Sequence, residues 1–312
     1  MRYYFAPMEG ITDSIFRRVH HRYFGGVDRY YMPFLSPTIH RALTHKEDRE
    51  LPMAESEEFC AVPQVLTKVA DDFLWAAQVC ADRGYREVNL NVGCPSGTVV
   101  SKGKGSGMLR DVNALDAFLD EIFSKSPLSI SVKTRLGLED PGEFPAILEV
   151  FNRYPIQELT VHPRVRKQFY DGGIFEESFA FAVQNSKNPL CFNGDIATLA
   201  DAHRIAQKYP QVDAVMIGRG LVGNPGMLQG STDVQTLEHF HNELLETYTV
   251  VFGGGRNAMF RLKENWHFLI THFEDSEKLW KRLRKTTDLN EFRAIATEIF
   301  HTKKWSDAPI NL

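Results

Sequence analysis

Cys94 is the residue whose type and position most suggest chemistry. It lies in a polar turn formed by residues 92–96. A free thiol has a pKa of about 8.5, so it is mostly protonated at neutral pH and can donate a proton. Cysteine is more often a small buried apolar residue, and we assign that role to the other three cysteines: Cys60, Cys80 and Cys191. Cys94 is therefore the candidate general acid.

Lys133 lies in a run, 129–134, that is otherwise suited to burial. A buried lysine requires a partner or a function. Its amine can form a Schiff base, as in barrel aldolases. It can instead hold positive charge beside a reduced flavin ring. The third alternative is an ordinary ion-paired lysine that extends to solvent. The residues alone do not decide among the three.

Two glycine-containing turns, 193–195 and 218–220, are candidates for binding a phosphate. Glycine lets the backbone approach a phosphate, and the N–H groups at the start of a following helix attract its charge. Arg219 can add a bidentate contact. The alternative is that both segments are simple turns.

The segment 102–107 carries Lys102 and Lys104 among alternating glycines. It does not match a phosphate-loop motif. It can be a mobile flap whose lysines reach an anionic substrate. A solvated loop without function is the alternative that the spacing alone favours.

Short strand-like runs alternate with helical patterns over the first 230 residues, which predicts parallel strands joined by helices. Eight runs are mostly β-branched, aromatic or apolar, as expected of strands covered on both faces. They are Tyr3–Pro7, Arg29–Pro33, Ala61–Leu66, Glu87–Asn91, Ser129–Thr134, Glu158–His162, Leu190–Asn193 and Ala214–Gly218. This α/β pattern predicts a (β/α)8 TIM barrel. A doubly wound sheet is disfavoured because no glycine fingerprint follows the first strand.

The pattern changes after Gly230, where amphipathic helices replace strands. The expected helices are Leu237–Phe252, Phe260–Phe273, Glu277–Lys285 and Leu289–Phe300. We therefore predict a barrel domain over 1–232 and a small all-α C-terminal domain over 233–312.

Composition limits the other classes of function. The formal net charge is -4, which counts against a nucleic-acid binder unless a local basic patch exists. The cysteine spacing fits neither a zinc site nor a disulfide scaffold, so we expect no metal. The N-terminus has no signal-peptide pattern, and no apolar run is long enough to cross a membrane. We expect a cytoplasmic protein.

The motif Asn89-Leu90-Asn91-Val92-Gly93-Cys94-Pro95-Ser96 resembles the signature of the tRNA-dihydrouridine synthase family. The resemblance continues over most of the chain, at the expected strand ends. It includes the segments 6–10, Gln64, 131–137, 161–164, 193–195 and 215–220. In this family an FMN-binding barrel precedes a helical domain that helps to hold tRNA. The chain departs from the family pattern at 31–33 and after Arg164, and no subgroup is assigned.

The resemblance implies a role for each matching residue. Cys94 would be the catalytic proton donor. The FMN-binding residues would be Pro7, Met8, Glu9, Gln64, Lys133, His162, Asn193, Gly194, Asp195, Gly218 and Arg219. The residues facing the uracil or nearby RNA phosphates would be Asn91, Arg135 and Arg164. From their charge, Lys102 and Lys104 could add contacts to RNA phosphates.

The implied reaction is reduction of the uracil 5,6 double bond, with NADPH or NADH as the reductant and tRNA as the partner. Hydride adds at C6, and C5 then requires a proton. We expect a monomer without a protein partner. The alternatives are an FMN-dependent enzyme that acts on a free pyrimidine, like the dihydroorotate dehydrogenases, and a non-catalytic RNA-binding relative. A lyase that uses Lys133 as a Schiff base is more remote.

Overall fold

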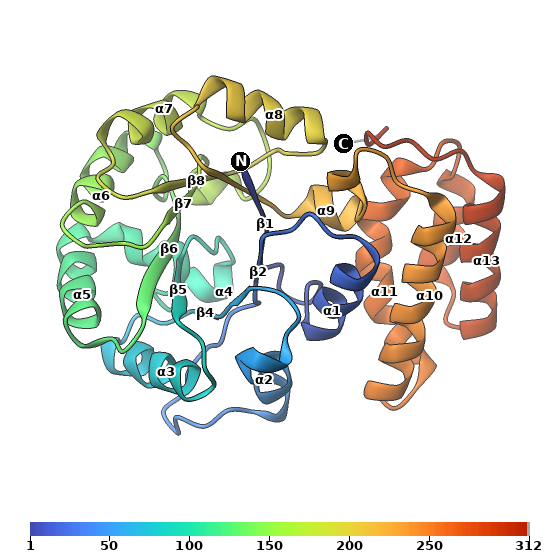
Figure 1. Ribbon diagram of the computed structural model, residues 1–312, viewed down its shortest axis with the longest axis horizontal. Helices are drawn as coiled ribbons and strands as arrows, with labels where there is room; N and C mark the ends of the chain where they lie inside the picture. Colours follow the sequence, from blue (N-terminus) through green and yellow to red (C-terminus); the bar gives the residue numbers. More distant parts are fainter. Residues whose placement is uncertain (311–312) are drawn as a thin grey trace. The chain divides into compact units, whose positions relative to one another are not determined.

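The computed structural model describes residues 1–310, and Figure 1 shows their helices and strands. The contacts divide the chain into two compact units. Unit 1 comprises Met1–Pro7, Asp28–Asp195 and Arg204–Met216. Unit 2 comprises Met8–Val27, Ile196–His203 and the chain from Ile217 onward.

One parallel sheet forms the centre of unit 1. Its strands are β1 (Arg2–Phe5), β2 (Arg29–Tyr31), β3 (Ala61–Val62), β4 (Gln64–Val65), β5 (Glu87–Val92), β6 (Ser129–Arg135), β7 (Leu159–His162), β8 (Leu190–Asn193) and β9 (Ala214–Ile217). Their order is β3-β2-β1-β9-β8-β7-β6-β5-β4. The two outermost strands, β3 and β4, are separated in sequence only by Pro63. They are two halves of one strand, interrupted because proline has no N–H to donate to the ladder.

The sheet therefore closes into a barrel of eight strands, which confirms the predicted (β/α)8 fold with a helical C-terminal region. Each predicted strand is present. The main differences are the break at Pro63 and the earlier ends of β1, at Phe5, and of β2, at Tyr31, each two residues short of the prediction. Strands β5 and β6 extend one residue further, to Val92 and Arg135.

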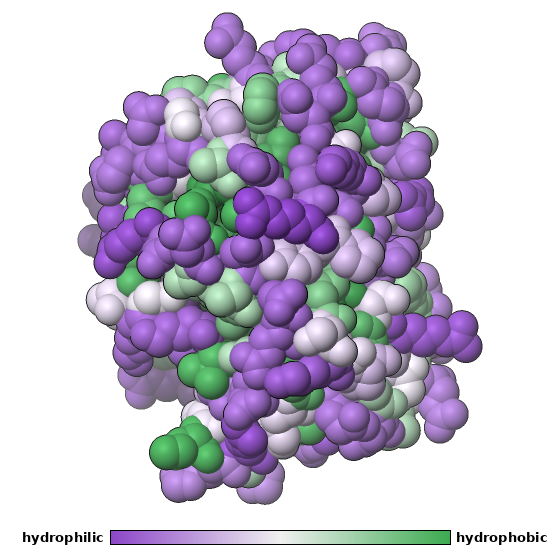
Figure 2. Space-filling model, turned by 90° about the vertical axis from the view of Figure 1, so that its left-hand side faces the viewer, coloured by the Kyte–Doolittle hydropathy of each residue, from purple (hydrophilic) through white to green (hydrophobic). Residues whose placement is uncertain are grey.

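Helices cover the outside of this barrel (Figure 1). They are α2 (His45–Glu50), α3 (Ala70–Asp82), α5 (Val112–Lys125), α6 (Phe144–Phe151), α7 (Glu176–Asn185) and α8 (Leu199–Lys208). The short helix α4 (Gly97–Val100) lies instead in the loop that follows β5. The side chain of Asp111 caps α5, and Leu115, Phe118 and Ile122 form its buried face. The outward faces are polar: the view in Figure 2 is largely hydrophilic, with apolar residues in small scattered groups.

The barrel interior is apolar in its middle and charged at the end where the strands begin. Tyr4, Tyr31, Cys191 and Met216 belong to one buried cluster. Below it, Arg29 Nη1 lies 2.8 Å from Glu87 Oε2, and Arg2 Nη2 lies 3.3 Å from Glu158 Oε2. The Tyr4 hydroxyl also donates to Glu158 Oε2 at 3.0 Å.

Unit 2 is helical. It contains α1 (Ser14–Tyr23), α9 (Arg219–Gly223), α10 (Val234–Val251), α11 (Gly255–Leu269), α12 (Glu277–Lys285) and α13 (Leu289–Thr302). In its core the Trp266 indole N–H donates to His241 Nε2 at 3.0 Å. Burial lowers the pKa of His241 to about 4, so its ring is neutral and able to accept this bond.

The four helices predicted after residue 232 are present, and α12 has the predicted bounds. The helix predicted to begin at Phe260 begins at Gly255, directly after the glycine turn, and ends at Leu269. Helix α1 also packs here, with the Phe240 ring 5.6 Å from Phe16 and 5.2 Å from Phe24. The contacts group α1 with the C-terminal helices, whereas a domain boundary near residue 232 remains a prediction. None of the helices within residues 1–310 has both the length and the apolar character needed to span a membrane.

Candidate active site

A chain of amide hydrogen bonds crosses the inner face of β4, β5 and β6. Asn91 Nδ2 donates to Gln64 Oε1 at 2.8 Å, and Gln64 Nε2 donates to Asn89 Oδ1 at 2.8 Å. Asn89 Nδ2 continues the chain to Ser131 Oγ at 2.9 Å. All four residues are buried. Each amide is fixed in one orientation, because flipping it would place donor against donor.

Asn91 also positions the Cys94 turn. Its Oδ1 accepts hydrogen bonds from the backbone N–H of Gly93 at 3.0 Å and of Cys94 at 2.9 Å. Cys94 keeps partial exposure at the end of β5. The predicted contact between Asn91 and the uracil stays a prediction, since the structure gives this amide internal partners.

The segment after Cys94 is exposed or half-exposed over most of residues 96–104 and packs tightly only from Gly105 onward. Residues 105–109 are buried, and Ser106 donates to the Cys94 carbonyl from both N and Oγ, at 3.1 and 2.8 Å. Gly105 has a φ of +57°, and a Cβ there would lie 2.9 Å from the Cys94 oxygen. Lys102 is exposed, and Lys104 Nζ donates to Ser36 Oγ at 3.3 Å. Contacts from these lysines to RNA remain predictions.

Of the remaining cysteines, Cys80 and Cys191 are buried as expected, and burial raises the pKa of each thiol. Cys60 is exposed, contrary to expectation.

Lys133 lies on the inner face of β6, between Asn91 of β5 and Thr160 of β7 in the sheet register. Within residues 1–310 its ammonium has no hydrogen-bond acceptor and no carboxylate partner. Desolvation first, and the positive charge of Arg135 second, lower the pKa of Lys133 to about 8. The Lys133 ammonium therefore has no negatively charged side chain beside it in the described chain.

Arg135, predicted to face the RNA, has a different task in the structure. Its side chain is 1% exposed, and it donates to three carbonyl oxygens: Gly93 at 3.1 Å, Val165 at 3.0 Å and Phe169 at 2.6 Å. It ties the Cys94 turn to the loop that follows β7. Desolvation is the main reason why the pKa of Arg135 falls to about 10.

Arg164 and Asp195 form a bidentate ion pair. Arg164 Nη1 lies 2.9 Å from Asp195 Oδ1, and its Nη2 lies 2.6 Å from Asp195 Oδ2. Arg164 is 2% exposed. The sequence did not indicate this pair, because the two residues were assigned to different ligands. Their direct contacts with RNA and FMN stay predictions, and the structure supports a role in holding the loops after β7 and β8 together.

His162 is buried at the end of β7, and its Nε2 lies 3.2 Å from Arg164 Nη1. Gly194 approaches it closely: a Cβ at Gly194 would lie 3.3 Å from His162 Cδ2. The Tyr170 ring is centred 6.1 Å from the imidazole and 5.3 Å from Arg135 Cζ. Sequence reasoning missed Tyr170, although an aromatic pair, Phe169-Tyr170, in a polar loop was a usable signal.

The remaining predicted FMN contacts lie on several strand ends. Pro7 is partly exposed after β1, and Asn193 Nδ2 donates to the Met216 carbonyl at 2.7 Å. Four others belong to unit 2: Met8, Glu9, Gly218 and Arg219. The Met8 N–H donates to Thr12 Oγ1 at 2.9 Å, and Gly218 is the residue before α9.

Unit 1 thus brings together Gln64, Asn91, Cys94 and Lys133 through neighbouring strands at the carboxyl ends. Barrel enzymes have their active sites at this end. The cluster combines fixed amides, a cation and an accessible thiol, so it can bind a polar planar ring and deliver a proton.

Comparisons with known proteins agree on one family. The sequence model of the family described as Dihydrouridine synthase (Dus) matches residues 4–307. The chain is 29% identical over 230 residues to tRNA-dihydrouridine synthase B of Pasteurella multocida, covering 73% of this chain and 68% of that protein. It is 27% identical over 329 residues to a probable tRNA-dihydrouridine synthase of Staphylococcus aureus, covering 98% and 95%.

Among solved structures, morphinone reductase is similar with a TM-score of 0.53 and 13% identity, covering 75% of this chain and 88% of that chain. A variant of NCR from Zymomonas mobilis has a TM-score of 0.52 at 13% identity, covering 77% and 87%. At this identity the likeness concerns the fold alone.

Proposed function

The chain belongs to the dihydrouridine synthase family, and we infer from this that it is a tRNA-dihydrouridine synthase. It reduces the uracil 5,6 double bond of specific tRNA uridines, with FMN as its cofactor and NADPH or NADH as the reductant. One structural observation carries this inference. A partly exposed thiol, Cys94, and a cation without a carboxylate partner in the described chain, Lys133, both lie at the same end of the barrel.

The residues present fit a flavin. The ring system of FMN offers hydrogen-bond acceptors along its pyrimidine edge, and this edge gains negative charge on reduction. Lys133 lacks an acceptor within the described chain, and Gln64 presents an amide whose orientation is fixed by Asn89 and Asn91. We propose that Lys133 and Gln64 hold the pyrimidine edge of FMN.

We propose that the predicted residues at the end of β8, Asn193, Gly194 and Asp195, contact the phosphate or the ribityl chain of FMN. Gly194 fits, because its φ of +149° favours glycine and a Cβ there would press against His162 at 3.3 Å, so the backbone is left open to a close contact. The Asp195 carboxylate would repel a phosphate, but its bidentate pair with Arg164 neutralises that charge.

Bound FMN supplies the hydride that adds to C6 of the uracil. The protein supplies the proton for C5, which we assign to the Cys94 thiol. Asn91 fixes the turn that carries this thiol through two backbone N–H groups, and Ser106 holds its carbonyl. The sulfur therefore has a defined position, which a proton transfer in the transition state requires.

Binding of RNA requires a basic surface, and the net charge of the chain is -4. Helix α12 supplies one locally. It carries one acidic residue, Glu277, and five exposed basic ones: Lys278, Lys281, Arg282, Arg284 and Lys285. We propose that α12 contacts tRNA phosphates, and that the helices after residue 232 form the RNA-binding part of the chain.

We also propose that the protein acts as a monomer in the cytoplasm, where tRNA is modified. An enzyme acting on a free pyrimidine is the second reading, but a small substrate gives no reason for a basic helix such as α12. A non-catalytic relative is disfavoured by the presence of Cys94 and Lys133.

The test is to map dihydrouridine in tRNA from a strain that lacks this gene and from the same strain complemented with it. Specific positions should lose dihydrouridine in the deletion strain and regain it with the wild-type gene. A Cys94→Ala gene is the matched control and should not restore them. An unchanged dihydrouridine map in the deletion strain would remove the proposal.

A further inference from the structure

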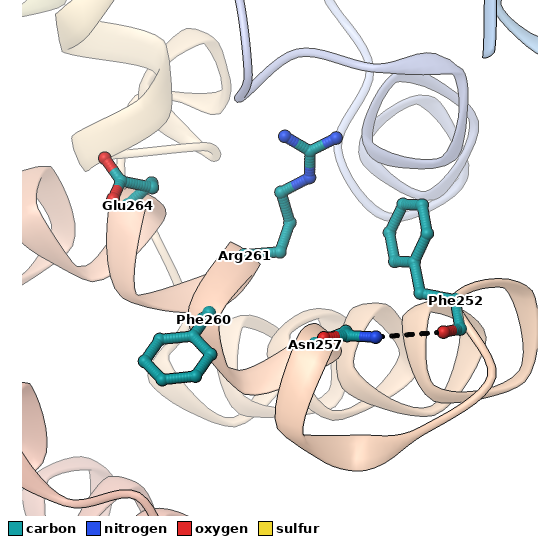
Figure 3. Close-up of a pocket in the computed structure, with 5 residues that line it drawn as sticks. All are labelled: Phe252, Asn257, Phe260, Arg261 and Glu264. Carbon is teal, nitrogen blue, oxygen red and sulfur yellow. Dashed lines mark hydrogen bonds between the residues drawn. The ribbon is translucent and has the colours of Figure 1, made fainter.

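A pocket of about 430 Å³ lies in unit 2 at the turn between α10 and α11. Five side chains line it: Phe252, Asn257, Phe260, Arg261 and Glu264. In Figure 3 Arg261 rises from α11 between Glu264 and Phe252, with Phe260 beside it on the same turn and Asn257 on the preceding turn.

The wall formed by Arg261 and Phe252 is fixed. The Arg261 guanidinium lies 5.5 Å from the centre of the Phe252 ring. Arg261 also donates to the Gly10 carbonyl at 2.5 Å and pairs with Asp13 at 3.3 Å. Asp13 in turn accepts from the Tyr248 hydroxyl at 2.9 Å. A ligand therefore meets a preformed planar surface, which lowers the entropy lost on binding.

The other side of the pocket is an exposed aromatic ring flanked by cations. Phe260 is 44% exposed, and two side chains lie over its ring, with Lys263 Nζ at 5.0 Å and Arg256 Cζ at 5.7 Å from the ring centre. A base that stacks on Phe260 therefore displaces one of these flexible cations. An aromatic ring with adjacent positive charge suits a planar heterocycle joined to phosphates. The polar groups suit its edge: Asn257 Nδ2 is engaged with the Phe252 carbonyl at 3.2 Å, which leaves Oδ1 as an acceptor, and the Glu264 carboxylate accepts as well.

The pocket adjoins the basic helix α12. Lys263 Nζ donates to the carbonyls of Arg284, at 3.2 Å, and of Thr286. The ammonium that lies over Phe260 thus also contacts the C-terminal end of α12, where Arg284 and Lys285 are exposed. A chain that places a base on Phe260 would have its phosphates within reach of these two cations.

We propose that this pocket binds an unpaired nucleobase of the RNA substrate, stacked on Phe260 while α12 holds the adjoining phosphates. The proposal rests on the function inferred above, that the protein acts on RNA. It adds a contact to a second nucleotide, distinct from the uridine that is reduced. Such a contact would anchor the RNA while the target base is extruded from its stack, which costs free energy.

The first test is the affinity of the FMN-loaded full chain for an unmodified tRNA transcript, measured by fluorescence anisotropy. Phe260→Ala should weaken binding roughly 5- to 100-fold, the usual loss for one base–aromatic stack. Phe260→Trp should retain the affinity. The matched control is Phe181→Ala on α7, which removes a comparably exposed ring, 37%, outside the pocket and should change nothing.

The salt dependence separates stacking from charge. Phe260→Ala should leave the slope of log affinity against log salt unchanged, because it removes no cation. Arg284→Gln should reduce the magnitude of that slope by about 0.7–0.9, the value for one phosphate contact.

The base itself can be found by a double-mutant cycle with abasic nucleotides placed one at a time outside the target position. At one position the abasic loss and the Phe260→Ala loss should coincide and not add. If Phe260→Ala binds like the wild type, or if its loss adds to that of every abasic site, the pocket does not hold a base. These outcomes differ from failure of the proposed function, in which the wild-type protein itself would not bind the transcript.

Discussion

The two ends of the barrel interior both bury charged groups but treat them differently. Where the strands begin, each of the two carboxylates has an arginine partner, Arg29 with Glu87 and Arg2 with Glu158. Where the strands end, Lys133 has no carboxylate partner in the described chain, and the nearby Arg135 carries the same sign. At the first end each carboxylate has a cationic partner, although desolvation still raises the pKa of Glu158, whereas at the second end the lysine has no anionic side chain beside it among the described residues.

This difference separates structural polar residues from those reserved for a ligand. A charge with restricted access to water is costly unless it is paired. Lys133 is only partly exposed and has no carboxylate partner in the described chain, so an anionic ligand would stabilise it. Polarity alone does not make the distinction, since Arg135 and Arg164 at the functional end also form hydrogen bonds with groups of the protein itself. The predictions below test whether the two ends behave differently.

Replacing Cys94 with alanine should have the largest effect. Formation of dihydrouridine should slow by roughly 10²- to 10⁴-fold, the usual contribution of a positioned acid. Bleaching of bound FMN by NADPH should keep nearly its normal rate, because that step does not use the thiol. The matched change, Cys191→Ala in the buried cluster, should lower stability and spare the chemistry. Equal loss of both half-reactions in Cys94→Ala would contradict this assignment.

Replacing Lys133 with glutamine should weaken FMN binding by roughly 10- to 100-fold near neutral pH, as expected for loss of a charged hydrogen bond. The pH dependence has a definite sign. The pKa of Lys133 in the free protein is lowered to about 8, so the ammonium is charged below pH 8 and neutral above it. Wild-type affinity for FMN should therefore fall as the pH rises above 8, whereas Lys133→Gln should show a flat profile. Fluorescence titration of the apoprotein gives both, and parallel profiles would refute the role of Lys133.

At the opposite end of the barrel, breaking the ion pair between Arg29 and Glu87 should lower stability and leave the affinity for FMN unchanged. Arg29→Met leaves Glu87 without its partner and should lower the free energy of unfolding by about 2 kcal/mol. The double change Arg29→Met and Glu87→Leu should recover part of this loss, because no unpaired charge remains. Urea denaturation of the apoprotein measures the free energy of unfolding of each variant. A loss of FMN affinity in the folded variants would show that the two ends are not independent.

The smallest expected effect concerns Asn91, which positions the Cys94 turn. Asn91→Ala should lower kcat by about tenfold and leave KM nearly unchanged, since roughly 1.4 kcal/mol of positioning is lost. Asn91→Asp keeps an oxygen for the two backbone N–H groups and should retain more activity than alanine. A change confined to KM would instead favour the predicted contact between Asn91 and the uracil.

Much of the fold was predictable, because local patterns determine it. The barrel strands are apolar runs of the right length, and the C-terminal helices repeat apolar residues at helical spacing. The break at Pro63 follows from the missing N–H of proline. By contrast, the packing of α1 with the C-terminal helices depends on Phe16 meeting Phe240, and nothing in either segment signals a partner so distant in sequence.

The candidate site was predictable in its residue types and less so in their tasks. Cys94 and Lys133 stand out because each is unusual in its local setting. In the sequence, Arg135 and Arg164 resemble arginines that bind RNA. In the structure Arg135 instead binds backbone carbonyls and Arg164 pairs with Asp195, and only the folded loops bring these partners together. For the same reason the contact between Tyr170 and Arg135 was not foreseen.

The most direct test of the account is to offer tRNA to the reduced enzyme. The wild-type protein is reduced with NADPH, freed of excess reductant and mixed without oxygen with an unmodified tRNA transcript, while the flavin absorbance is followed. The account predicts rapid reoxidation by this tRNA, and none by the same tRNA after its target uridines have been converted to dihydrouridine. Reoxidation by free uracil or orotate but not by the unmodified tRNA would contradict it.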